Sequence, residues 1–279
     1  DWPARQLLEK LGAIPDAYFI SHFHLDHANN VKNIEQLGIP VYCPRPEHEF
    51  PMDLDRFLVA NGSYDYGVAP LMKEFIYNGL GFRELDSVAP FSPGEEFHFG
   101  SVRIRTIHAP GHSPGHTVFA VQSGAGREVL FTSDTGLDKM GAWYGFKYCR
   151  LEGVRRSILS LERLYGEGDY LLASSHGPVY REKNHSAFKE ALLKVEATER
   201  RLLDLFAPGQ ELTLDDIALR GVYYRTNSVA KLDEFGRKLY FFWESGILIN
   251  HLEELEEKGL IRRGKCDTWV LNEPAALSR

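Results

Sequence analysis

Ala17-Tyr18-Phe19-Ile20-Ser21-His22-Phe23-His24-Leu25-Asp26-His27 joins a short apolar segment to three histidines and an aspartate. Residues two apart in an extended chain point the same way, so His22 and His24, leaving a strand, are expected to bind one ion together. Asp26 and His27 lie past the strand end, where they can face the neighbouring side of the same pocket. Neutral imidazole and carboxylate are good zinc ligands. The stretch therefore predicts a metal site at a strand end.

The partners that such a site needs follow in three later motifs. His112 lies in Pro110-Gly111-His112-Ser113, Asp134 in Thr132-Ser133-Asp134-Thr135-Gly136, and His176 in Ser174-Ser175-His176-Gly177. Seven ligands of this kind suit two adjacent ions. Ions roughly 3.5–4 Å apart can share a bridging hydroxide and stabilise both the attacking and the leaving atoms of a displacement.

Together these motifs resemble the metallo-β-lactamase superfamily. His-x-His-x-Asp-His is the first motif of that family, Gly-His-Ser-Pro-Gly-His at 111–116 matches the second, and the segments of Asp134 and His176 match the third and fourth. The resemblance implies an αββα sandwich with the metals at the mouth between two sheets. It also implies one metal on His22, His24 and His112, a second on Asp26, His27 and His176, and Asp134 as the bridge.

The remaining histidines have weaker support. His116 resembles the second histidine of the family's Gly-His-x-x-Gly-His motif, which is generally not a ligand. We expect it to support the ligands from behind, and a purely structural role is the alternative. His98 and His108 lie in hairpin-like strands and are interpreted as structural.

Length and composition indicate a cytoplasmic enzyme with one large and one small domain. The 279 residues carry a net charge of −7, which gives no general attraction to nucleic acid or anionic membranes. No apolar run reaches the roughly 18 residues that a bilayer span needs. Cys43, Cys149 and Cys266 are widely separated and are interpreted as reduced thiols. We expect a small-molecule substrate, with no membrane partner.

The N-terminal part differs from the family's pattern. Residues 3–11 have the spacing of an amphipathic helix. The resemblance implies several strands before this helix, and none precedes it in this sequence. The first sheet is therefore expected to be truncated or built unusually.

The middle of the chain predicts alternating strands and helices. Helices are expected near 28–37 and over 151–165, and strands over 17–21, at Val41, and over 96–99, 102–107, 117–122, 128–132 and 170–173. Residues 47–90 exceed what a core connection needs and are rich in aromatic residues. We interpret them as a helical cap over the metals within a catalytic domain of residues 1–194, with purely local packing as the alternative.

A second aromatic stretch follows Asp134 closely in the sequence. Trp143, Tyr144 and Lys147 are predicted to contact the substrate. Lys147 would contact an anionic group, and an ordinary surface lysine is the alternative.

Residues 195–279 predict a winged-helix-like domain. A helix over 185–206 is followed by a capping box at Thr213 and Asp216, a long helix over about 238–258 and short strands at 260–263 and 268–271. The segment from Glu244 to Glu256 resembles the C-terminal module of certain metallo-β-lactamase-fold proteins, among them acyl-thioester hydrolases and mitochondrial β-lactamase-like endoribonucleases.

The charge of this domain argues against a nucleic-acid reader. Fifteen acidic and twelve basic residues lie between Val195 and Arg279, whereas binding to phosphates needs a basic face. Arg262, Arg263 and Lys265 make only a small basic spot. We favour a packing role, either closing the active-site cleft or forming a homo-oligomer interface, and keep nucleic-acid contact as the alternative.

These features predict a hydrolase with a dinuclear-metal-activated hydroxide. Metal lowers the pKa of bound water to about 7; Asp134 would hold both ions, and Asp26 would orient the hydroxide and move its proton. Zinc is expected, with iron or manganese as alternatives. A thioester or related carboxylic ester is the first substrate hypothesis, as in hydroxyacylglutathione hydrolase chemistry. A metal-dependent endoribonuclease or phosphodiesterase is the second, and an iron sulfur dioxygenase the third.

Overall fold

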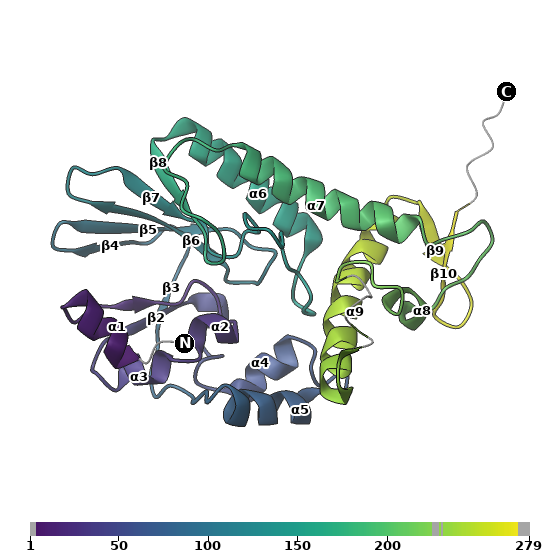
Figure 1. Cartoon of the computed structure of the whole chain (residues 1–279), viewed down its shortest axis with the longest axis horizontal. Coiled ribbons are helices and arrows are strands. Elements are labelled where there is room, and N and C mark those ends of the chain that lie inside the picture. The colour runs from purple at the N-terminus through teal and green to yellow at the C-terminus, as the bar shows by residue number, and fades with distance from the viewer. Residues whose placement is uncertain (1–3, 225–228, 230, 273–279) are drawn as a thin grey trace.

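Two β-sheets lie one above the other between layers of helices in the computed structural model (Figure 1). The structure describes residues 4–224, 229 and 231–272. Helices α6 (Leu151–Glu167) and α7 (Ser186–Leu203) cover the upper sheet of the view, and α1 (Ala4–Leu11) and α3 (Val31–Glu35) lie beside the lower one. The α/β class predicted from the sequence is confirmed.

The smaller sheet contains three parallel strands in the described part of the chain. They are β1 (Tyr18–Phe19), β2 (Val41–Pro44) and β3 (Ala89–Phe91), in that order. Parallel neighbours need a crossover connection. The first crossover contains α2 (Leu25–Ala28) and α3, so the single helix predicted near 28–37 is instead two short helices separated at Asn29 and Asn30. Asparagine favours helix ends over helix interiors because its side chain competes for backbone hydrogen bonds.

The second crossover is the predicted cap. It contains the 3₁₀ turn η1 (Arg45–Glu47), the helices α4 (Leu54–Ala60) and α5 (Ala69–Glu74), and the π-helical turn η2 (Phe75–Gly79). The side chain of Asp53 accepts the backbone N–H groups of Asp55 and Arg56 and so begins α4. Residues 47–90 thus contain short helices joined by turns, in place of the more continuous helical segment predicted.

The larger sheet has the order β4-β5-β6-β7-β8. The strands are β4 (Glu96–Phe99), β5 (Val102–His108), β6 (Thr117–Ser123), β7 (Glu128–Phe131) and β8 (Tyr170–Ala173). Neighbours are antiparallel up to β7, and α6 carries the chain across to β8, which is parallel to β7. The predicted strands agree with these bounds to within one residue.

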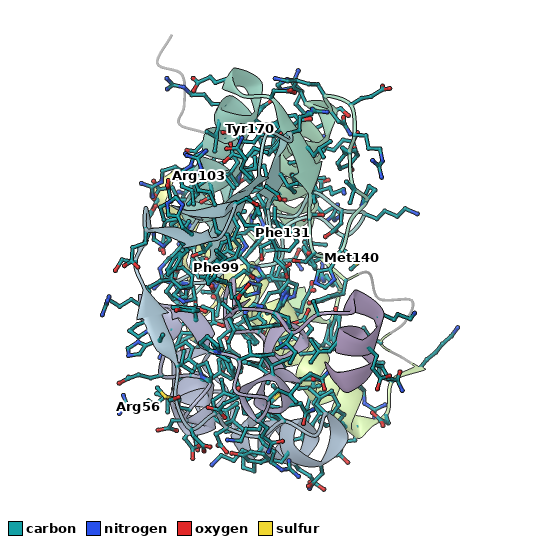
Figure 2. The ribbon with its side chains drawn as sticks, turned by 90° about the vertical axis from the view of Figure 1, so that its left-hand side faces the viewer. Arg56, Phe99, Arg103, Phe131, Met140 and Tyr170 are labelled. Carbon is teal, nitrogen blue, oxygen red and sulfur yellow. The ribbon has the colours of Figure 1, made fainter. Side chains whose placement is uncertain are left out.

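Aromatic side chains join the two sheets. The ring of Phe19 on β1 lies 4.9 Å from Phe97 and 5.9 Å from Phe119, both on the larger sheet. Figure 2, turned by 90°, shows the side chains filling the space between the sheets and labels Phe99, whose ring also contacts Phe19. Aromatic pairs in this edge-to-face geometry add to the energy of simple burial, so β1 is held firmly where it delivers the first histidines.

The C-terminal elements are α8 (Leu214–Ala218), α9 (Glu234–Glu257), β9 (Ile261–Arg263) and β10 (Trp269–Leu271). The predicted capping box is present, with Thr213 Oγ1 accepting the Asp216 N–H. Helix α9 packs into two apolar cores: Phe242 joins the core of the sheets, and Leu252 joins a second core around Trp269. This shared helix fixes the C-terminal elements against the rest of the molecule.

The cysteines and the length of the apolar helices were the remaining points predicted from the sequence. Cys43 and Cys149 are buried free thiols, and Cys266 is an exposed one. No helix in the described part of the chain has the length and apolar content that crossing a membrane requires.

Candidate metal centre

Five of the seven predicted ligands lie in loops that follow the carboxyl ends of strands, and the other two, Asp26 and His27, lie in helix α2. His22 and His24 follow β1, His112 follows β5, Asp134 follows β7 and His176 follows β8. The backbone N–H of Thr117 donates to the Ser21 carbonyl oxygen over 2.9 Å and links the β1 end to the larger sheet. Strands of both sheets therefore deliver their polar loops to one place.

Three imidazoles meet at the first group of ligands. His112 Nε2 lies 3.0 Å from His22 Nε2 and 3.0 Å from His24 Nδ1. The other nitrogen of His112 donates to the carbonyl oxygen of Trp143 over 2.7 Å, so Nε2 carries a lone pair. Nitrogen lone pairs converging at this distance repel one another unless a cation lies among them, and the donor set therefore fits a metal ion.

The second group shares Asp134 with the first. Asp134 Oδ2 lies 3.2 Å from His27 Nε2 and 3.5 Å from His176 Nε2, and 3.7 Å from His112 Nε2 of the first group. Asp26 Oδ2 lies 3.2 Å from His176 Nε2. The ligand atoms within each group lie within 4.8 Å of one another. All seven predicted ligands thus come together, with one carboxylate oxygen between the two sets.

Burial and neighbouring charges shift the pKa values of these groups in different directions. It lowers the pKa of His22, His24 and His112 and keeps their rings neutral, the form that binds a metal. Burial opposes ionisation of Asp134, but the His27 hydrogen bond and the nearby imidazoles hold its pKa well below the usual range. For His27, burial is outweighed by the hydrogen bonds to Asp134 and Asp26, which raise its pKa to about 9.

His116 supports Asp134 from behind. Its Nδ1–H donates to the Ala109 carbonyl oxygen over 2.8 Å, and its Nε2 accepts the Asp134 backbone N–H over 3.0 Å. The preceding residue, Ser133, has φ 49°, a left-handed conformation that is uncommon for a residue with a side chain. These contacts orient the turn that presents the Asp134 carboxylate.

Glu47 holds two ligand loops together, and no sequence signal pointed to it. Its buried carboxylate accepts the backbone N–H of Phe23, between two ligand histidines, and that of Gly115, in the second motif. A Cβ on Gly115 would lie 2.9 Å from Glu47 Oε1. The lack of a side chain at Gly115 therefore leaves room for the Glu47 carboxylate to reach its backbone N–H.

A cavity of about 480 Å³ opens beside the ligands. The predicted cap contributes apolar side chains to its wall, and Trp243 on α9 closes another side. None of the described residues that line it is a lysine or an arginine. The lining residues are His24, Leu25, Asp26, Phe57, Met72, Phe75, Leu80, His112, Asp134, Asp138, Met140, Gly141, Trp143, Phe146, His176, Tyr223, Tyr224 and Trp243.

Of the three predicted substrate contacts, the structure places only Trp143 in this cavity. Tyr144 is buried on the opposite side of the loop, where its hydroxyl meets His251 Nε2 at 2.8 Å. Lys147 is exposed and pairs with Asp65 at 2.6 Å, as the surface alternative predicted. Consecutive residues of an irregular loop have no periodicity, so the sequence carried no signal for which of them would face the ligands.

Comparison with known proteins places the chain in a family. The family model of the metallo-β-lactamase superfamily matches residues 3–202. An uncharacterized protein of Mycobacterium leprae is 30% identical over 135 residues, which cover 48% of this chain and 56% of that protein. An N-acyl homoserine lactonase of Bacillus thuringiensis subsp. kurstaki is 26% identical over 136 residues, covering 48% of this chain and 44% of the lactonase. The chain spans about half the length of the curated relatives it matches.

Solved structures show the same fold. A metallo-β-lactamase family protein of Thermus thermophilus superposes with a TM-score of 0.69 at 23% identity, over 96% of this chain and 84% of that protein. A β-lactamase domain protein of Burkholderia ambifaria superposes with a TM-score of 0.70 at 16% identity, over 96% and 79%. With the family model matching well over half of its residues, the chain belongs to the metallo-β-lactamase superfamily.

Proposed function

We propose that this chain hydrolyses carboxylic esters, with thioesters as its main substrates, using two divalent metal ions. The observation that carries the proposal is the shared Asp134 oxygen between two ligand groups beside an apolar cavity. His22, His24 and His112 would hold one ion, and Asp26, His27 and His176 the other. Histidine and aspartate ligands of this kind suit zinc, and they would also bind iron or manganese.

The residues around the ligands support this chemistry. Two ions held there supply Lewis-acid activation of water and of an ester carbonyl. Asp26 lines the cavity, where its carboxylate would accept a hydrogen bond from the attacking water and pass a proton toward the leaving group. Phe57, Phe75 and Trp143 would surround the acyl chain and exclude bulk water.

The second candidate, a phosphodiesterase, has weaker support. Outside the metal ligands, the described cavity wall contains no lysine or arginine that would bind further phosphates of a polynucleotide. The guanidinium of Arg263 stacks 3.5 Å from the Trp269 ring centroid, so this hairpin residue has a packing role. An iron sulfur dioxygenase normally uses one metal, and the two ligand groups favour a two-metal hydrolase instead.

We further propose that residues 195–279 form a winged-helix-like module beside a catalytic domain of residues 1–194. The order α8, α9, β9, β10 is that of helix, helix and hairpin. Tyr223, Tyr224 and Trp243 from this part of the chain line the cavity. Its role would be to close the cleft over the substrate. The excess of acidic over basic residues in this module argues against the alternative role, binding of nucleic acid.

A substrate panel tests the proposed reaction. The metal-replete protein is expected to hydrolyse acyl thioesters and, since a lactone is also a carboxylic ester and one relative is a lactonase, acyl lactones to some extent. Protein treated with a chelator should lose this turnover and regain it when zinc is restored. Cleavage of bis(p-nitrophenyl) phosphate without thioester or lactone turnover would contradict the proposal and favour the phosphodiesterase.

Glu47→Gln should weaken metal binding although Glu47 is not a ligand. The amide offers one acceptor oxygen in place of two, so its NH₂ would face the Phe23 or the Gly115 N–H, and a ligand loop would be released. Loss of a supporting contact typically weakens metal affinity about 10–100-fold, which a competition titration with a chromophoric chelator measures.

Glu244→Gln is the matched control. Glu244 is also buried and accepts backbone N–H groups, those of Val222 and Tyr223, but it contacts no ligand loop. We expect it to lose stability while keeping the metal affinity of the parent. Equal metal affinities in Glu47→Gln and the parent protein would show that Glu47 does not position the ligands.

A further inference from the structure

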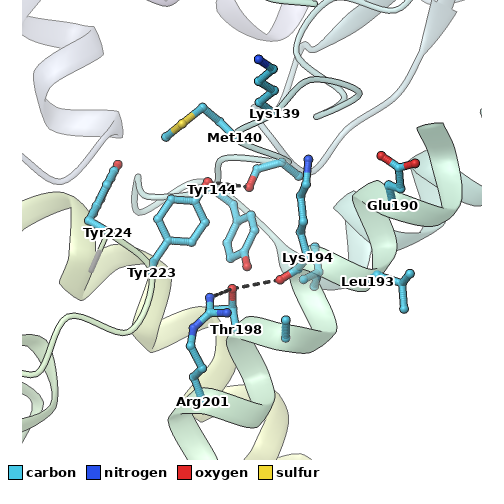
Figure 3. A pocket seen from close by; sticks show the side chains of 13 residues that line it. Lys139, Met140, Tyr144, Glu190, Leu193, Lys194, Thr198, Arg201, Tyr223 and Tyr224 are labelled. Atoms are coloured by element: carbon cyan, nitrogen blue, oxygen red, sulfur yellow. Dashed lines mark hydrogen bonds between the residues drawn. The ribbon is translucent and has the colours of Figure 1, made fainter. Parts of the chain in front are cut away.

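A second cavity, of about 670 Å³, adjoins the one at the metal ligands (Figure 3). Helix α7 forms one wall, and the loop that follows Asp134 forms another. Met140, Tyr223 and Tyr224 line both cavities and form the ridge between them. The volume lies in the range of small-molecule sites, roughly 300–1,000 Å³.

This second cavity is cationic. Lys139, Lys194 and Arg201 line it, against one acidic side chain, Glu190, in a protein of net charge −7. Among the described residues, none of the three cations has a carboxylate within ion-pair distance. Lys194 Nζ donates to the Asp138 carbonyl oxygen, and Arg201 donates to the Val222 carbonyl oxygen and to Thr198 Oγ1. The cavity lining therefore carries three basic side chains against one acidic one, with no direct ion pair between these described side chains.

The two cavities differ in the part of a substrate that each would accept. Apart from the metal ligands, the walls of the first cavity are mostly apolar and aromatic, which suits an acyl chain. Cations gathered in a concave surface instead attract and orient anionic groups. A substrate whose scissile bond lies at the ligands would thus extend its acyl group into the first cavity and its leaving group over the ridge into the second.

The ridge itself is held rigidly. Tyr223 Oη donates to the Ala142 carbonyl oxygen over 3.0 Å, and Trp143 Nε1 donates to Tyr224 Oη. Glu244 also accepts the backbone N–H groups of both tyrosines. The two tyrosines that separate the cavities are therefore fixed in position by hydrogen bonds.

We propose that the cationic cavity binds an anionic group on the thiol side of the substrate, so that the preferred substrates are thioesters of a phosphate- or carboxylate-bearing thiol. This inference rests on the proposed thioesterase function. It assigns the second cavity a role in substrate selection: it would favour a charged leaving group over a neutral one and take no part in the bond cleavage.

Three thioesters that share a hexanoyl group and differ in the thiol test this proposal. The thiols are N-acetylcysteamine, glutathione and coenzyme A. The first thiol is neutral, the second carries carboxylates and the third phosphates. We expect kcat/KM for at least one anionic thioester to exceed that of the neutral one about tenfold or more at low salt. The preference should fall as ionic strength rises, and the arm that shows it identifies the anion.

A charge reversal at Lys139 locates the effect. Lys139 is exposed with no hydrogen-bond or ion-pair partner among the described residues, so Lys139→Glu should fold normally. It is expected to reduce the ratio of anionic to neutral kcat/KM about tenfold. Lys189→Glu changes the net charge equally at an exposed position on helix α7, outside both cavities, and should leave the ratio as it was.

Failure of this inference is distinct from failure of the proposed function. Metal-dependent hydrolysis of all three thioesters at equal kcat/KM, or an equal effect of both charge reversals, would overturn the cationic subsite and leave the thioesterase standing. If no thioester is hydrolysed, the thioesterase fails, and calorimetry with coenzyme A and glutathione decides the subsite. Binding that Lys139→Glu weakens and Lys189→Glu does not would support it, and no binding of either thiol would overturn it.

Discussion

His24→Ala is expected to abolish hydrolysis while leaving most of the fold intact. The substitution removes one of the two imidazole nitrogens that lie 3.0 Å from His112 Nε2. Loss of a supporting contact already costs about 10–100-fold in metal affinity or activity, and loss of a ligand should cost more. Turnover of the best thioester, metal content by mass spectrometry and the thermal melting curve should be measured on the same sample.

His98→Ala serves as the control for removing a histidine. His98 lies on β4, outside both ligand groups, with its side chain 63% exposed and paired with Glu96. The His98→Ala variant should have the same metal content and turnover as the parent protein. Full activity in His24→Ala would refute the metal assignment, and unfolding of His24→Ala alone would show that His24 acts mainly in the core.

Gly111→Ala is expected to cause the largest loss of stability. Gly111 has φ +129°, which residues with a side chain rarely adopt, and a Cβ there would lie 2.2 Å from the backbone nitrogen of Val154. Because helix α6 cannot yield as a flexible side chain can, the free energy of unfolding should fall by about 3–5 kcal/mol. The displaced His112 should also lower the metal content. Urea unfolding of the metal-free and metal-loaded protein measures both effects.

Gly100→Ala measures the cost of a positive φ without a steric clash of the added Cβ. Gly100 also has a positive φ, +58°, in the hairpin between β4 and β5, but an added Cβ would have no neighbour within 4 Å. Its cost should be about 1–2 kcal/mol, that of the left-handed conformation alone. Equal destabilisation by the two substitutions would mean that α6 moves aside without cost at Gly111.

The seven side chains that meet at the candidate metal centre, and much of the fold, could be predicted from local patterns in the sequence. Ligand chemistry is local: a histidine or aspartate is recognised by its type and by its spacing from the next, as in the stretch from His22 to His27. The larger sheet was equally predictable, because alternating strands and the Gly100-Ser101 turn carry their own signals. The single helix predicted near 28–37 is wrong at Asn29 and Asn30, because the apolar spacing outweighs the weaker preference of asparagine for helix ends.

The surroundings of the ligands depend on how distant segments pack together. Phe75 from the cap and Trp243 from α9 line one cavity although they are far apart in the sequence. Tyr144 points away from the ligands while its neighbour Trp143 faces them, and Glu47 joins Phe23 to Gly115 by backbone hydrogen bonds. Such contacts depend on how separate segments pack and not on any local pattern. The sequence therefore predicts the ligand set, and the packing of the cap, α7 and α9 shapes the two cavities beside it.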